Sequence, residues 1–533
     1  MRRKKQVICR AVILLIGSGI YALLFSLGSQ VETIGFTRIS ETATRFCIAF
    51  PVAVTALYCL TRVLWSSAGI VSNRTCPSRN GFPVYGAGLF LILCWFPMFL
   101  IEYPGSFMYD TQRQVFQIAK NSYDAFHPLL HTLMMRACLS MFSIFQSIEK
   151  CAALYSIIQM LVLAMCFAEV SAAIARITNK KAGYLTVAFF AFYPSHMAMA
   201  CNYIKDVLFS GFFSLFLALA MEWNVTGEMP KKRIVCMIAS GALSCLMRNN
   251  MIYAFAAWMV YMALQKYGRR LAIIALAAVL IATGVNEGMI RTLNAKRGSV
   301  GEMLSVPVQQ LARARRDASS SFTEIDASEM DAFFRSKGWE KYEPTLSDPV
   351  KADLNEEYLI KNMKPFFELW IRIGKRCPTV YMDAWCHLIL PSIYPYSTYR
   401  VAQPYIETGL QPGVVAAPFA QPPMQQPRRF EKIREWLSET IYATGADRVP
   451  VLRWLMNTGA VFWGLLALLM MTVYYRGWKY FNALILPLFL YGTYLLGPVM
   501  QGRYLYPFIC VLPMFVLSAI NACKTQREIE NED

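Results

Sequence analysis

A long series of apolar segments, each about the length of a membrane-spanning helix, limits the fold of this chain more than any other feature. A helix needs roughly 20 apolar residues to cross a bilayer. Of the 533 residues, 56% are hydrophobic and 16% are charged, whereas soluble domains carry about 25% charged residues. The chain is therefore predicted to be an all-α polytopic membrane protein with about twelve spans, at residues 11–28, 43–64, 82–103, 151–174, 183–202, 206–223, 234–247, 250–265, 271–290, 453–474, 481–498 and 504–521.

One further apolar stretch, 127–148, decides the orientation of the later spans. It contains two histidines and an arginine and has no long clean apolar core. If it forms helices on the outer surface and does not cross, the basic clusters at 2–5, 176–181, 231–233 and 266–270 all lie on one side. Short cytoplasmic loops are rich in Lys and Arg, so we predict that both termini are cytoplasmic. The net charge of +18 is then largely a topology signal, and a nucleic-acid partner is disfavoured.

This topology divides the chain into three parts. Residues 1–290 form a membrane module with nine spans and an outer loop at 104–150, which carries the surface-lying helices. Residues 291–452 form a mainly helical extracytoplasmic domain, and its Pro-rich segment 411–427 is predicted to be a loop. Residues 453–533 contain the last three spans and a cytoplasmic tail. The localisation predicted is the cell membrane.

Ionisable residues at the outer ends of the spans are candidates for a functional site, because charges at a membrane require a partner or a function. Asp110 follows the third predicted span in the sequence EYPGSFMYDTQRQ. A carboxylate on an outer loop can act as a general base or bind a divalent cation such as Mg²⁺ or Mn²⁺. The alternative is structural, because Asp before an amphipathic run is a common helix N-cap.

Two histidines of the same loop form a second motif. His127 precedes a proline that starts a predicted helix, and His131 follows one helical turn later. No HExxH pattern accompanies them, so a phosphate contact, or a histidine satisfied at the interface, is favoured over a zinc site.

Lys205 and Asp206 introduce two charges into an otherwise apolar run between the fifth and sixth spans. Lys205 can bind a phosphate, and Asp206 can hold Lys205 or an acceptor group. The structural alternative is a local ion pair, which contributes little at a wet surface.

Two arginines interrupt apolar segments at the same predicted face. Arg248 precedes Asn249 in the motif RNN, and Arg503 precedes Tyr504 in the motif GRYLYP. Arginine stays protonated and binds phosphate oxygens in pairs, so both positions suit an anion site. A tight turn at RNN and an interfacial anchor at GRY are the structural alternatives.

Gln309 and Gln310, in the motif SVPVQQLAR, open the outer domain. Amide side chains can contact a sugar or can line the surface of a helix. Each of these motifs is short, but all of them fall on one predicted face of the bundle, and this convergence favours a site.

Taken in order along the chain, these motifs resemble the GT-C superfamily of polyprenyl-phosphate-dependent membrane glycosyltransferases. The segments KDVLFS, RNN, SVPVQQLAR and GRYLYP are similar to a Gram-positive bacterial branch of it. The resemblance implies a helical bundle whose first outer loop carries the catalytic acid, which matches Asp110 here. The chain departs from the family in having three spans before that loop and no acidic pair in it, so metal use does not follow.

The resemblance implies that a sugar moves from a polyprenyl phosphate to a cell-envelope acceptor on the outer face, with inversion. Asp110 would be the base, and Asp206 would orient the acceptor or Lys205. The phosphate would be bound by Lys205, Arg248 and Arg503, with help from His127. A transporter or flippase of lipid-linked glycans, a glycan polymerase or ligase, and a non-catalytic envelope scaffold are the alternatives. The sequence leaves open the sugar, the acceptor, the carrier length, partner subunits and the oligomeric state.

Overall fold

The computed structural model describes residues 2–36, 38–70, 81–107, 109–266, 268–397, 427–440 and 449–532. These residues are almost entirely helical, with one pair of two-residue strands, so the all-α prediction is confirmed. The predicted Pro-rich loop lies outside the described residues, except for Pro427.

Seven helices among the described residues are long and apolar enough to cross a membrane, which identifies a helical membrane protein. They are α1 (Arg2–Ile34), α2 (Ile39–Ile70), α3 (Val84–Ile101), α7 (Ile148–Ile177), α10 (Lys205–Thr226), α13 (Arg269–Thr292) and α24 (Tyr506–Glu532), the last counted with the turn η7 (Gly502–Leu505). Five shorter helices overlap the other predicted spans: α8 (Lys180–Phe192), α11 (Lys231–Met247), α12 (Met251–Leu264), α22 (Thr458–Tyr474) and α23 (Trp478–Tyr494).

The remaining helices lie between these spans. The early loop forms α4 (Tyr109–Lys120), α5 (Leu129–Leu139) and α6 (Phe142–Phe145), and α9 (Pro194–Ala200) follows α8. The later insertion forms α14 (Ser305–Asp317), α15 (Glu324–Ala332), α16 (Asp348–Lys351), α17 (Glu356–Lys361), α18 (Met363–Arg376) and α19 (Pro378–Ile393). Helices α20 (Glu431–Thr440) and α21 (Pro450–Met456) lead back to the bundle. The part of the insertion that the structure describes is mainly helical, as predicted, and encloses a core of its own that includes Val308, Phe333 and Phe366.

Helix α10 lies at the centre of the bundle. It is apolar on all sides, as expected for a helix surrounded by others, and Phe209, Phe213 and Phe216 on it are completely buried. It packs against α7, α11, α23 and α24. This packing fixes the position of its first turn, which carries Lys205 and Asp206.

A short parallel pairing joins the segment after α3 to the segment before α10. Strand β1 (Ser106–Phe107) pairs with β2 (Asn202–Tyr203), and the rings of Phe107 and Tyr203 stack with centroids 4.3 Å apart. Gly105 precedes β1 with φ +140°, and a Cβ there would lie 2.5 Å from the hydroxyl of Ser156. Only glycine combines this backbone conformation with such close packing.

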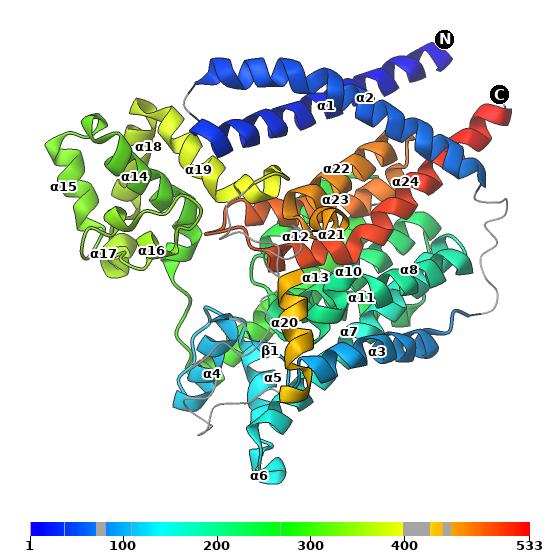
Figure 1. Cartoon of the computed structure of the whole chain (residues 1–533), viewed down its shortest axis with the longest axis horizontal. Helices are drawn as coiled ribbons and strands as arrows, with labels where there is room; N and C mark the ends of the chain where they lie inside the picture. Colours follow the sequence, from blue (N-terminus) through cyan, green and yellow to red (C-terminus); the bar gives the residue numbers. More distant parts are fainter. Residues whose placement is uncertain are drawn as a thin grey trace.

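The elements are arranged along the bundle with the two chain ends together. Figure 1 shows both termini at the right, whereas α4 and the insertion helices α14–α18 lie toward the left. The residues of the predicted site lie at helix ends and in loops, so their positions depend on which helix ends pack together.

Candidate functional site

The strand pairing brings the early loop to the start of α10. Ser106 is in register with Asn202. Asp110 follows Ser106 by four residues and Lys205 follows Asn202 by three, so the pairing brings these two residues close together. The hydroxyl of Thr111 donates to the carbonyl oxygen of Tyr203 and ties the first turn of α4 to this segment. Asp110 and Lys205 meet here.

The carboxylate of Asp110 is held by two cations. Its Oδ2 lies 2.6 Å from Nζ of Lys205 and 2.8 Å from Nη1 of Arg503. The three side chains are 15%, 13% and 11% exposed, respectively, so the cluster is mostly buried but reached by solvent. Burial raises the pKa of the Asp110 carboxyl, but the charges of Arg503 and Lys205 outweigh it and hold this pKa well below its usual value.

His127 completes the cluster as a neutral side chain. Its Nδ1 lies 3.1 Å from Nζ of Lys205 and 3.9 Å from Oδ2 of Asp110. An ammonium group only donates hydrogen bonds, so Nδ1 accepts and the ring proton is on Nε2. Burial, and then the charge of Lys205, lower the pKa of His127 to about 3.

The buried neutral His127 predicts that acid destabilises the protein. Its pKa in the folded state lies below the ordinary value of about 6.5, so below that pH the unfolded chain binds a proton that the folded chain does not. Stability is therefore lost as the pH falls from about 6.5 toward 3, by roughly 2 kcal/mol at pH 5 for this residue. Unfolding in detergent, measured at pH 7 and pH 5, should show a smaller drop for His127→Gln than for the wild type. Equal drops would contradict this prediction.

A second ion pair lies beside the first. Asp206 is completely buried, and its carboxylate accepts a hydrogen bond from Nη1 of Arg248. Arg248 is the C-cap of α11 and Asp206 lies in the first turn of α10, so each charge has the sign that its helix end favours. The guanidinium carbon of Arg248 lies 4.5 Å from the ring centroid of Tyr494 and 4.3 Å from that of Tyr504.

This geometry changes the role that we predicted for Asp206. Neighbouring residues of a helix point about 100° apart, so Lys205 contacts Asp110 while Asp206 turns to Arg248. With no exposed surface, Asp206 cannot orient an acceptor in this structure, and it is a positioning residue for Arg248. Arg248 is likewise engaged by Asp206 and the two rings.

Tyr504 connects the two ion pairs. It stacks on Arg248 on one side, and the guanidinium carbon of Arg503 lies 5.2 Å from its ring centroid. Two neighbours of Arg248, Tyr494 and Asn250, were not among the candidate site residues predicted from the sequence. The side chain of Asn250 accepts a hydrogen bond from Nε of Arg248 and donates one to the hydroxyl of Thr493. A tyrosine at the end of an apolar segment is typical of any interfacial belt, and therefore gave no specific signal.

His131 is a structural residue of this region and is not open to a ligand. It is completely buried. Its Nδ1 lies 2.9 Å from the amide oxygen of Gln114 on α4, and its Nε2 lies 2.7 Å from the hydroxyl of Tyr155 on α7. Both ring nitrogens are therefore used to hold α4 and α7 to α5, in contrast to the substrate contact that we predicted.

Three other predicted residues are not brought into the cluster. Asn249 is exposed in the turn after α11. Gln309 and Gln310 are buried in the insertion, which lies apart from α4 in Figure 1. The amide of Gln309 donates to the carbonyl of Glu343, and that of Gln310 to the carbonyl of Tyr381. They stabilise the core of the insertion.

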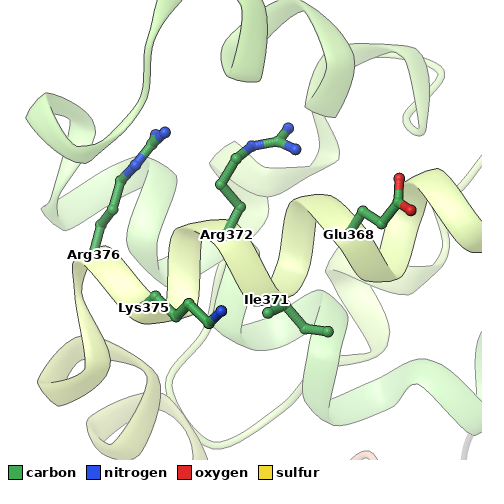
Figure 2. Close-up of a pocket in the computed structure, with 5 residues that line it drawn as sticks. All are labelled: Glu368, Ile371, Arg372, Lys375 and Arg376. Atoms are coloured by element: carbon green, nitrogen blue, oxygen red, sulfur yellow. The ribbon is translucent and has the colours of Figure 1, made fainter.

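The insertion also has an open cavity of about 450 Å³ along α18. Figure 2 shows Arg372 and Arg376, two of its lining residues, extending to the same side of this helix. Both bind Asp326, at 2.8 and 2.5 Å, and Arg372 also binds Glu329, at 2.5 Å, so two carboxylates face the two arginines. Their charges are already compensated, so this cavity does not have the character of the Asp110 cluster.

The residues around Asp110 do not fit the divalent cation that we considered. Two cationic side chains contact the same carboxylate oxygen, and they would repel Mg²⁺ or Mn²⁺. Within the described residues, no three His, Cys, Asp or Glu side chains are grouped so that they could hold a metal ion. The cluster has two cations for one carboxylate and is suited to an anion.

The fold and this cluster define a class: a helical membrane protein with ion-paired side chains where its helix ends meet. The chain belongs to a family of unknown function, DUF6020, which matches residues 120–533. The match includes Lys205, Arg248 and Arg503 and begins after Asp110. No curated protein and no solved structure matches the chain.

Proposed function

We propose that the protein is a membrane glycosyltransferase that moves a sugar from a polyprenyl phosphate to a hydroxyl group of a cell-envelope acceptor. The observation that carries the proposal is the partly exposed carboxylate of Asp110 beside Lys205 and Arg503. Sugar transfer from a lipid phosphate requires a base for the acceptor and cations for the leaving phosphate. Glycosyl transfer through an oxocarbenium-like transition state commonly uses carboxylates.

The reaction is a direct displacement. The acceptor oxygen attacks the anomeric carbon and forms the new C–O bond as the bond from that carbon to the phosphate oxygen breaks. The acceptor proton passes to Asp110, and the electron pair of the broken bond stays on the polyprenyl phosphate. Lys205 and Arg503 stabilise the added negative charge, and the anomeric configuration inverts. Arg248 sets the position of Tyr504, on which Arg503 rests.

The charge of the cluster supports this donor. Asp206 compensates Arg248, and His127 is neutral, so Lys205 and Arg503 against Asp110 leave one net positive charge. A sugar linked through one phosphate carries one negative charge. The match favours this kind of donor over a neutral lipid.

The proposed topology has twelve spans, with both termini in the cytoplasm and the insertion outside. Five helices of 13–17 residues are counted with the seven longer ones. The apolar stretch Leu129–Phe145 is assigned to the outer surface, because the basic clusters of the later loops then all lie on the cytoplasmic side. Green fluorescent protein fused to the C-terminus should fluoresce, and alkaline phosphatase fused after Lys341 should be active. The opposite pattern of activities would reverse the orientation and place the Asp110 cluster on the cytoplasmic face.

A transfer assay tests the function. Purified protein in nanodiscs is given radiolabelled polyprenyl-phosphate sugars, one at a time, together with cell-envelope extract. Label that moves to the acceptor supports the enzyme and identifies the sugar. Folded protein that moves no label from any donor would contradict the proposal and favour a transporter, a flippase or a scaffold. Products extended by many sugars would instead indicate a polymerase or ligase.

A further inference from the structure

In this structure the proposed base, Asp110, is paired with the two cations that would bind the donor phosphate, Lys205 and Arg503. Lys205 and Arg503 both point at a single oxygen of Asp110. The same two cations are needed by the donor phosphate, and a carboxylate bound to two cations is a weak proton acceptor. While these ion pairs are formed, neither of the two proposed tasks can be performed fully.

We propose that the donor phosphate displaces the Asp110 carboxylate from Lys205 and Arg503, so that donor binding itself releases the catalytic base. This inference rests on the proposed function for its role, but the competition between a carboxylate and a phosphate can be measured without any sugar transfer. The ligand recognised is a lipid-linked phosphate group.

The cations have hydrogen-bonding capacity for such a ligand. The Nε of Arg503 has no hydrogen-bond partner within the described part of the chain, and of the three ammonium protons of Lys205 two are directed to Asp110 and His127. A phosphate presents several oxygens and matches the fork of an arginine better than one carboxylate oxygen does. Arg503 also rests on Tyr504, so the guanidinium stays in place when its partner is exchanged.

The N-terminus of α4 can stabilise the carboxylate of Asp110 after it is displaced. Asp110 lies in the first turn of α4, where unpaired backbone N–H groups and the helix dipole stabilise a negative charge. Its side chain is 15% exposed, so an acceptor hydroxyl can reach it. Loss of the two cations raises its pKa toward the usual value and makes it a better proton acceptor for the displacement described above. After transfer it gives the proton to water and returns to the cations when the carrier leaves.

The test measures binding of a polyprenyl phosphate, in phosphatidylcholine nanodiscs, to the wild type and to Asp110→Asn. Removal of the competing carboxylate should tighten binding by roughly tenfold, whereas Arg503→Gln should weaken it by a similar factor. The polyprenol without phosphate should bind equally weakly to all three proteins. Inorganic phosphate, as a separate arm, shows whether the lipid is required for recognition. Asp348→Asn, an exposed ion-paired aspartate of the insertion, is the matched control and should not change binding.

Unchanged or weaker binding by Asp110→Asn would overturn the inference. Asp110→Ser provides a second neutral variant if Asp110→Asn does not fold, and it should bind more tightly as well. If the variants bind more tightly but the wild type transfers no sugar, the displacement of Asp110 by phosphate is supported and the proposed glycosyltransferase function is rejected. If the wild type transfers sugar but neither variant binds more tightly, the glycosyltransferase function is supported and the displacement of Asp110 by phosphate is rejected.

Discussion

Asp110→Asn is expected to abolish sugar transfer while the protein remains folded and bound to its donor. The variant keeps the shape of the side chain and removes its ability to accept a proton. Loss of a positioned general base lowers rates by about 10²- to 10⁴-fold. The measurement is the rate of label transfer under single-turnover conditions, with folding checked by thermal unfolding in detergent.

The control for this experiment is again Asp348→Asn, which removes the same charge from an exposed partner of Lys351 in the insertion and should transfer at the wild-type rate. If Asp110→Asn is folded and transfers at the wild-type rate, Asp110 is not the base. Because this variant is also expected to bind the donor phosphate more tightly, low activity cannot be attributed to lost donor affinity.

Asp206→Asn is expected to destabilise the protein strongly. The carboxylate is completely buried against Arg248, whose side chain is 10% exposed. Removal of one partner leaves a buried charge without its counter-ion, which typically costs about 3–5 kcal/mol. The unfolding temperature in detergent should fall by several degrees, and transfer should fall with it, because Arg248 no longer fixes Tyr504.

The double variant Asp206→Asn with Arg248→Gln tests whether the loss of stability comes from the unpaired charge or from changed packing. It removes both charges, so it should be more stable than the sum of the two single changes predicts. Additive losses would show that the two residues act independently and would contradict the coupling seen here.

The sequence determined the helical membrane fold and where the important residues lie along it. Hydropathy is a local property: an apolar segment of sufficient length forms a helix in a bilayer whatever its neighbours are. For this reason seven of the predicted spans fall on the seven helices that are long and apolar enough to cross a membrane. A charge at the end of an apolar segment is also visible locally, and for this reason the sequence alone singled out Asp110, Lys205, Arg248 and Arg503, which form ion pairs in the structure.

Only the tertiary structure decided which of these residues are partners. Lys205 and Asp110 are 95 residues apart in the chain, and the β1–β2 pairing brings them together. Adjacent in sequence, Lys205 and Asp206 face different neighbours because of the helical rotation between them. Gln309 and Gln310 belong to the separate core of the insertion. A pairing of charges depends on which helix ends meet, and this is set by the packing around α10, which no short motif records.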